Sequence, residues 1–301
     1  MTSRRAAPLV DLHAHTTASD GSDPPQALVA AAAAAGIGVL AVTDHDTITA
    51  VAAAQQAGRQ LGVEVLTGCE ITAAVGDRVV HVLLYGQGLL DPDLADAVEV
   101  ARRGRHERNL AVGERLHRLT GVGYRDAAEL AGGSALSRAH FARALIARGA
   151  VADVTEAFDR YLSAGRPAYV PAPSVPLTDA VALASKAGGV AVLAHPGRLA
   201  PEERERVLAE ALAAGIDGLE VWHPQHDADL RGSLTELVER RGLLATGGSD
   251  YHGHHKPNVH LGTPAVPAQV LDTLRNRLAT DGPLCVGFAQ NGAKQPKGGT
   301  T

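Results

Sequence analysis

Histidines and carboxylates recur along this chain directly after short apolar runs. The first example is Leu9-Val10-Asp11-Leu12-His13-Ala14-His15, followed closely by Asp20. Because side chains on a strand alternate between its two faces, His13 and His15 should leave the same face. An HxH pair alone also fits two solvated or locally hydrogen-bonded histidines. Its interpretation therefore depends on the other segments.

Each later apolar run is also accompanied by a histidine or a carboxylate, and most of these are possible metal ligands. The nine candidates are His13, His15, Asp20, His45, Glu70, His81, His195, Asp250 and His252. Imidazole nitrogens mixed with carboxylate oxygens suit Zn, Mn or Fe, whereas Ca or Mg would favour oxygen alone. Nine donors exceed the need of one ion, so the sequence predicts two or three divalent cations, with Glu70 as a natural bridge. Such a cluster would lower the pKa of a bound water and direct the hydroxide at phosphorus.

The elements that position these residues are predicted to be alternating strands and helices, which is typical of an α/β fold with a parallel sheet. The expected strands are 9–13, 39–43, 64–69, 79–84, 190–194, 219–222 and 243–246. The expected helices between them are 23–35, 49–61, 177–187, 202–213, 230–240 and 267–279. Seven strands are enough to close a barrel, and functional residues of such a barrel lie at the carboxyl ends of its strands.

Residues 99–170 break this rhythm and carry a different charge. Helices are expected at 94–119, 124–131, 138–148 and 154–161, without a convincing strand between them. Residues 99–170 contain 12 Arg, no Lys and 8 acidic residues, a net +4, although the whole chain is at −5. The chain prefers Arg to Lys throughout, so the absence of Lys means little. The reversal of sign indicates that an anionic ligand meets a helical insert.

The predicted organisation is therefore a barrel interrupted by an insert. Residues 1–98 form its first part, 99–170 the substrate-binding insert, 171–288 its second part, and 289–301 a disordered tail. The start of the chain lacks the apolar core of a signal peptide, and the longest apolar run, Ala27 to Ala35, is too short to cross a bilayer. Two distant cysteines fit a reducing compartment. We expect a cytoplasmic protein without a membrane association or a stable protein partner.

The motifs resemble the PHP (polymerase and histidinol phosphatase) family of metal-dependent phosphoesterases. The shared segments are HAHTTASDG at 13–21, TDHDT at 43–47, GCEIT at 68–72, His81, AHPG at 194–197 and GSDYHG at 248–253. The resemblance implies a distorted (β/α)7 PHP barrel, seven-stranded, with a small all-helical inserted domain. It also implies one metal on His13, His15, Glu70 and Asp250, a second on Glu70, His81 and His195, and a third on Asp20, His45 and His252.

The insert is similar to that of a subgroup of PHP enzymes that acts on nucleotides. The similarity lies in Arg138 to Arg143 and Gly165 to Tyr169, and in the segment from Glu220 to His226. The resemblance implies removal of phosphate from nucleotide 3′,5′-bisphosphates and AMP, or trimming of short RNA from the 5′ end. Guanidinium groups bind phosphate through two hydrogen bonds, so the substrate-binding candidates are Arg138, Arg143, Arg166 and His223. For each arginine the alternative is a solvated helix face. His223 is also the catalytic candidate, as a donor to the phosphate or the leaving group.

The remaining polar residues are predicted to have supporting roles. Asp44 and Asp46 flank a ligand and should orient it or cap a helix. Cys69 and Trp222 alternate away from their polar neighbours and should pack in the core. A role at the site is left open for His226, His254 and Lys256. A surface position is expected for His106, His117 and His260.

Three other functions compete with this interpretation. An amidohydrolase has a similar HxH strand and terminal Asp, but commonly uses a lysine at a strand end, whereas Lys186 is on a predicted helix and Lys256 in a loop. A histidinol phosphate phosphatase shares the metal set but has less use for a basic insert. A non-catalytic metal-binding module of a polymerase is disfavoured because the ligand set is complete and no polymerase is present.

Overall fold

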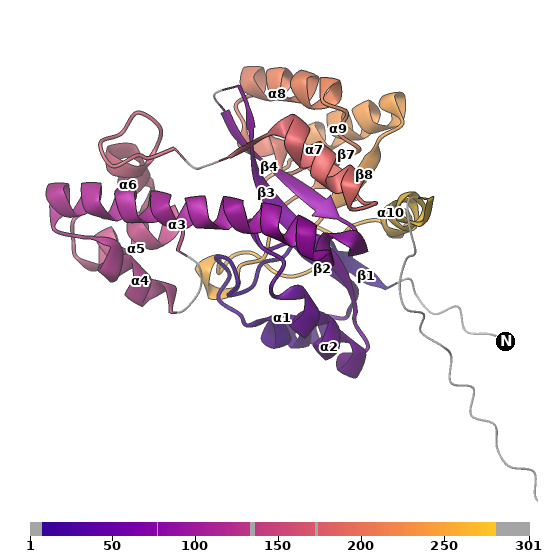
Figure 1. The fold of residues 1–301 in the computed structure, drawn as a ribbon, viewed down its shortest axis with the longest axis horizontal. Coiled ribbons are helices and arrows are strands. Elements are labelled where there is room, and N and C mark those ends of the chain that lie inside the picture. Colours follow the sequence, from indigo (N-terminus) through magenta and orange to yellow (C-terminus); the bar gives the residue numbers. More distant parts are fainter. Residues whose placement is uncertain (1–7, 77, 133–135, 172–173, 281–301) are drawn as a thin grey trace, which may run out of the picture.

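An eight-stranded sheet with helices around it forms the centre of the molecule (Figure 1). The computed structural model describes residues 8–76, 78–132, 136–171 and 174–280. The strands are β1 (Leu9–Asp11), β2 (Ile37–Val42), β3 (Glu64–Val75), β4 (Arg78–Tyr85), β5 (Val175–Pro176), β6 (Val190–Leu193), β7 (Gly218–Trp222) and β8 (Leu244–Gly247). Their order is β1-β2-β3-β4-β6-β7-β8, and the two-residue β5 pairs with β3.

The sheet is not wholly parallel, which corrects one expectation. Strand β4 runs antiparallel to both β3 and β6, while the other pairs are parallel. Only two residues separate Val75 from Arg78, too few for the crossover that a parallel connection needs. His81 lies opposite Thr72 in this hairpin and so reaches the site from the first half of its strand. The sequence also missed β5 and the extension of β3 beyond Cys69.

The first and last strands of the sheet meet where the HxH and GSD segments lie. The backbone N–H of Leu12 donates to the carbonyl of Gly247 over 3.1 Å, and Ala14 pairs with Tyr251. A Cβ added to Gly248 would lie 2.4 Å from the backbone nitrogen of His13. Glycine at this position therefore allows the two segments to approach closely.

Apolar residues fill the sheet and the spaces under its helices. Inside the sheet, Leu12, Leu83 and Val192 share a buried cluster with Leu274 of helix α10 (Ala268–Thr280). A second cluster lies under α7 (Leu177–Lys186), α8 (Pro201–Ala213) and α9 (Ala228–Arg241). A third joins α1 (Pro25–Ala34) and α2 (Val51–Leu61) to β2. The sheet is thus fixed by apolar packing on both sides.

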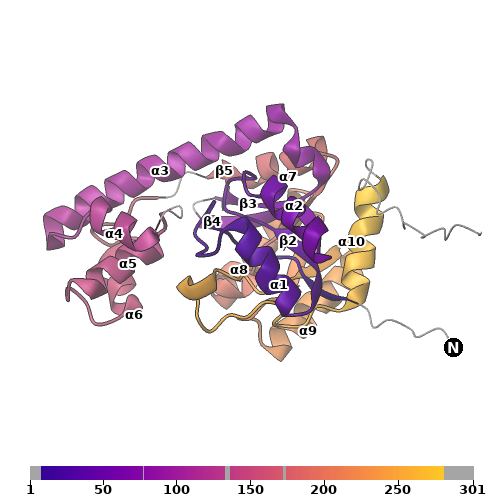
Figure 2. The same ribbon diagram turned by 90° about the horizontal axis from the view of Figure 1, so that it is seen from below.

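Helices between β4 and β5 extend to one side of the sheet (Figures 1 and 2). After a 3-10 turn at Gln87–Leu90 come α3 (Pro92–Thr120), α4 (Tyr124–Ala131), α5 (Arg138–Ala147), α6 (Val154–Ala157) and a π-helical turn (Phe158–Leu162). They share a separate buried cluster that includes Leu116, Phe141 and Leu145. Helix α3 is 29 residues long and runs from beside the sheet into this group. Here "the insert" means the helical segment from α3 to the π-helical turn.

Some sequence expectations concern residues that the structure does not describe. The predicted tail at 289–301, the first seven residues and Cys285 lie outside the described residues. Among the helices that are described, none has the length and apolar character needed to span a membrane.

Candidate metal centre

The nine predicted ligands come from seven strand ends or loops and lie close together. Three groups have donor atoms that all lie within 4.8 Å of one another: His15, Asp20, His45 and His252; His13, His15 and Asp250; and His45, Glu70 and His81. His195 joins the last group, because its Nε2 lies 2.9 Å from Glu70 Oε1. The fold therefore brings every predicted ligand to one place.

Glu70 lies between the groups. Its Oε2 is 3.4 Å from His13 Nε2 and 3.2 Å from His15 Nε2, while its Oε1 is 3.0 Å from His81 Nδ1. Burial alone would raise the pKa of Glu70, but His45, His81 and His13 hold it well below its usual value. An ionised carboxylate in this position can share its two oxygens between two cations.

The donor set fits divalent cations. Asp20 Oδ1, His45 Nδ1 and Glu70 Oε2 are buried and make no hydrogen bond of good geometry among the described residues, although a side-chain nitrogen or oxygen of another candidate ligand lies 3.0 to 3.2 Å from each. Burying such polar atoms without a partner is costly, so a ligand is expected to satisfy them. Nitrogen and oxygen donors in this mixture suit Zn, Mn or Fe.

Backbone strain also concentrates here. Asp46, His195 and Asp250 are the non-glycine residues with a positive φ in the described chain, at 51°, 28° and 53°. Two are candidate ligands and the third follows His45. Strained residues persist where surrounding contacts fix them, and they cluster at functional sites.

Glu220, on β7, is a buried residue whose role the sequence did not reveal. Its Oε1 accepts from His13 Nδ1 over 2.8 Å, and its Oε2 accepts from the backbone N–H of His195 over 2.6 Å. Burial would raise its pKa, but His13 lowers it to about 2. Because an ionised carboxylate only accepts, His13 donates from Nδ1, and the neutral ring therefore has its lone pair on Nε2, where a cation could bind.

Asp44 and Asp46 hold loops at the site rather than capping helices. Asp44 accepts from the backbone N–H and the hydroxyl of Thr16. Asp46 accepts from the backbone N–H of Thr72 over 2.7 Å and from its hydroxyl over 2.8 Å. Helix α2 starts later, after Ala50.

Two histidines that follow β7 have different roles. The backbone N–H of Gln225 donates to His223 Nδ1, so the neutral His223 ring carries its proton on Nε2, which lies 3.4 Å from Asp250 Oδ2. His226 uses both nitrogens on the backbone, donating to Val221 O and accepting from Gly197 N–H. His226 therefore stabilises loops, whereas His223 has a donor at the ligand cluster.

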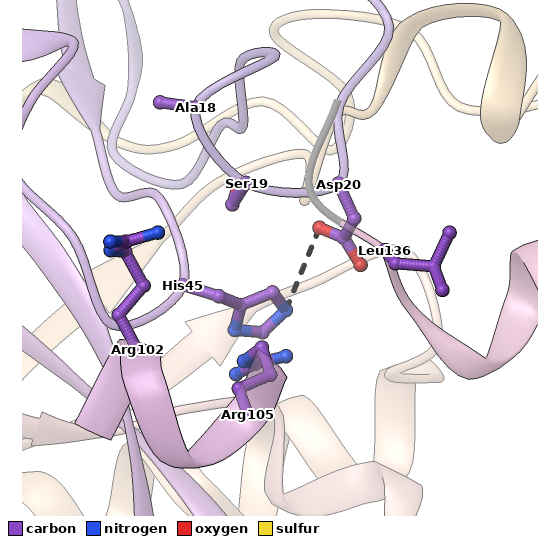
Figure 3. A pocket seen from close by; sticks show the side chains of 7 residues that line it. All are labelled: Ala18, Ser19, Asp20, His45, Arg102, Arg105 and Leu136. Carbon is purple, nitrogen blue, oxygen red and sulfur yellow. Dashed lines mark ion pairs between the residues drawn. The ribbon is translucent and has the colours of Figure 1, made fainter. Parts of the chain in front are cut away.

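Arginines of α3 reach the same place, as Figure 3 shows. Arg102, Arg105 and Leu136 line a pocket with Ala18, Ser19, Asp20 and His45. The guanidinium of Arg105 donates to Asp46 Oδ2 from Nε over 3.0 Å and from Nη2 over 2.6 Å. Arg105 was missed in the sequence, although Arg102, Arg105 and Arg108 recur at helical spacing.

The predicted substrate-binding arginines lie in different surroundings. Arg138 lies over the rings of Phe158 and Tyr169, with its Cζ 5.8 Å and 5.9 Å from their centroids. Arg143 is partly buried, and its Nη1 lacks a hydrogen-bond partner in the described chain. Arg166 is exposed. The first two are thus constrained by their surroundings, and the third is not.

The other residues named in the sequence analysis lie on the surface, in the core or at the site. His106, His117, His254 and His260 are exposed, and Cys69 is fully buried. Trp222 packs against two apolar clusters. Lys256 donates from Nζ to Asp250 Oδ2 over 2.6 Å, so this lysine belongs to the site.

The comparison with protein families agrees with this geometry. The model of the PHP domain matches residues 11–168, which contain six of the nine predicted ligands. The chain belongs to the PHP family. This family was predicted from the motifs, and that prediction is confirmed.

Three proteins to which this PHP protein is similar are named for reactions at phosphate esters. It is 37% identical over 247 residues to a 3′,5′-nucleoside bisphosphate phosphatase of Chromobacterium violaceum, covering 81% of this chain and 87% of that protein. It is 34% identical over 257 residues to the 5′-3′ exoribonuclease Rnm of Escherichia coli, covering 84% and 88%. A crystal structure from Bifidobacterium adolescentis, described as a metal-dependent phosphoesterase, superposes with a TM-score of 0.79 at 33% identity, covering 90% and 97%.

Proposed function

We propose that this PHP protein hydrolyses phosphate esters of nucleotides, of the 3′,5′-bisphosphonucleotide or AMP type, or trims short RNA from the 5′ end. The main support is the pocket in which Arg102 and Arg105 of α3 lie beside Asp20 and His45. Cationic side chains next to a buried group of metal-ligand types suit a substrate whose anionic phosphate must reach cations. The names of the relatives support the same class of substrate.

We assign the ligands as the family resemblance implies, for two or three divalent cations. His13, His15, Glu70 and Asp250 would hold one, and Glu70, His81 and His195 a second. Asp20, His45 and His252 would hold the third. When bound, such cations lower the pKa of water and neutralise charge on phosphoryl oxygens.

The protein's own groups orient the substrate and move a proton. His223 has its proton on Nε2, as its contact with Gln225 requires, and we assign it the donation of that proton to the leaving oxygen or to the phosphate. Arg138, Arg143 and Arg166 are assigned to bind substrate phosphate. In this proposal residues 1–98 and 171–288 build the barrel and residues 99–170 bind the substrate.

A panel of substrates tests the proposal. The purified protein, supplied with Mn, is compared on a 3′,5′-bisphosphonucleotide, AMP, short 5′-phosphorylated RNA and histidinol phosphate, with D250N as the inactive control. Turnover of a nucleotide or RNA is expected. Turnover of histidinol phosphate alone would overturn the substrate class, and absence of any phosphate release would favour a non-catalytic module. Metal analysis of the same sample identifies the bound ion.

A further inference from the structure

His140 is a buried polar residue of the insert that the proposed mechanism does not use. It lies in the first turn of α5, a helix of 10 residues, and its side chain is 2% exposed. The first turn of a helix has unsatisfied backbone N–H groups and the positive end of the helix dipole. A second feature is needed to show whether a ligand belongs there, and the imidazole ring provides it.

The hydrogen bonds of His140 fix the position of its proton. The backbone N–H of Ser137 donates to His140 Nδ1 over 3.0 Å. An amide nitrogen can only donate, so Nδ1 is an acceptor, and the neutral ring carries its proton on Nε2. That Nε2 is buried and lacks a hydrogen-bond partner within the described residues. His140 therefore presents a buried donor without an acceptor, which is costly unless a ligand supplies one.

The surroundings of this donor lead to the candidate metal centre. The ring of His140 meets that of His255 edge to face, with centroids 4.7 Å apart. His255 Nδ1 lies 2.9 Å from the carbonyl oxygen of Asp20, to which it donates. Asp20 and His252 also act electrostatically on His140. The unused donor thus lies at the boundary between the insert and the group that contains Asp20, His45 and His252.

A cationic group follows on the same face of α5. Residues three apart on a helix are neighbours, so Arg143 lies beside His140. Arg143 Nη1 is buried and has no hydrogen-bond partner in the part of the chain that is described. A helix N-terminus, a neutral N–H donor and a guanidinium N–H together favour an anionic oxygen ligand.

We propose that His140 and Arg143 form an anion subsite for a phosphoryl oxygen, in which His140 is a neutral donor through Nε2. The inference rests on the proposed function in that the bound anion belongs to a phosphate-ester substrate. It adds to that function a substrate-binding residue, His140, and a fixed protonation form for it. Inorganic phosphate, the product of such a reaction, has the same chemistry and should occupy the same subsite.

Variants of His140 separate ligand binding from helix capping. H140Q should keep the cap, because glutamine at the third helical position accepts from the backbone of the capping serine, and it retains one donor. In H140L a side chain of similar size replaces the imidazole ring, and both the cap and the donor are lost. H106A is the control, since His106 is an exposed histidine of α3. The affinity of the Mn-supplied protein for inorganic phosphate is measured by calorimetry, with KM for the best substrate and the melting temperature.

We expect H140L to weaken phosphate binding and raise KM by roughly 10-fold or more, because a hydrogen bond to a charged group is lost. H140Q should change both by much less, and H106A by less than about twofold. Equal phosphate affinity in all four proteins would overturn the subsite, as would equal losses in H140Q and H140L. If H140L does not fold, R143Q provides the test and should weaken phosphate binding in the same direction, with unchanged affinity overturning the proposal. Phosphate titration requires no turnover, so failure of the proposed function is seen separately in the substrate panel.

Discussion

The barrel side and the insert side of the site satisfy their polar groups in different ways. On the barrel side, Asp46 accepts from Thr72 and Arg105, and Glu220 joins His13 to the backbone of His195. On the insert side, Arg108 Nε, His140 Nε2 and Arg143 Nη1 are buried without a partner among the described residues. The unpartnered atoms of the barrel include Asp20 Oδ1, His45 Nδ1 and Glu70 Oε2, which are of metal-ligand type, whereas these atoms of the insert are N–H donors. The barrel's groups therefore suit cations, and the insert's donors suit an anion.

The charged groups of the insert support the same contrast with the barrel. Burial, followed by repulsion from Arg105 and Arg138, lowers the pKa of Arg108 to about 9. Positive groups that repel one another at close range are stabilised by an anion between them. We therefore expect substitutions in the barrel to impair metal binding or turnover, and substitutions in the insert to weaken substrate binding.

The largest effect is expected at Asp250. D250N removes a charged ligand candidate that faces His13 and His15. Cations contribute several kcal/mol to the transition state, so kcat should fall by at least about 1000-fold. Phosphate release and the melting temperature measure the two consequences. The exposed Asp229, changed to Asn, is the matched control, and retained turnover in D250N would contradict the assignment.

A smaller loss should follow from E220Q. In glutamine an NH2 donor replaces one of the two accepting oxygens, so the contact with either His13 Nδ1 or the His195 amide is lost. Changes to groups that orient ligands weaken metal binding by about 10- to 100-fold. Titration of the metal-free protein with Mn measures this affinity. The control E239Q, an exposed change on α9, should leave the Mn affinity unaltered. An Mn affinity of E220Q equal to that of the wild type would show that Glu220 only supports the fold.

In the insert, R138A should raise KM by about 10-fold while kcat changes by less than about twofold, if Arg138 binds ground and transition states alike. Phe158 and Tyr169 restrict its guanidinium, so little entropy is lost on binding. R166A should have a weaker effect, because that side chain is exposed. R118A, an exposed change on α3, is the control. A fall in kcat with constant KM would place Arg138 with the barrel residues instead.

The sequence predicted the ligand positions because its apolar runs end in histidine or carboxylate. Period-two alternation also predicted that His13 and His15 share a side, and their Nε2 atoms lie 3.2 Å apart. These are local patterns. The nine residues therefore needed only a barrel to bring them together.

Other features depended on contacts between distant residues. The pairing of Glu220 with His13 joins positions 207 residues apart, and Arg105 reaches Asp46 from 59 residues away. The positive φ of His195 and Asp250 has no signal in the sequence, because most His and Asp residues have a negative φ even though these types adopt positive values more often than other non-glycine residues. His140 was read only as part of an arginine motif, because its unpaired nitrogen depends on how α5 meets the barrel.

The smallest expected effect concerns stability and pH. Burial, with a contribution from His255, lowers the pKa of His140 from 6.5 to about 4. Between these values the unfolded chain binds a proton that the folded chain does not, so His140 makes stability fall as pH falls from 6.5 towards 4. H140Q lacks this group. From pH 7 to pH 5 the wild type should therefore lose on the order of 1 to 2 kcal/mol more unfolding free energy than H140Q does.

Urea unfolding of the metal-free proteins at the two pH values measures that difference, and H106A controls for removal of an exposed histidine. In H106A the loss between pH 7 and pH 5 should match that of the wild type. If H140Q also matches the wild type, His140 is protonated as easily as in the unfolded chain. Its Nδ1 would then not be held as an acceptor by Ser137, and the contrast between the cation-binding groups of the barrel and the anion-binding donors of the insert would lose its clearest example.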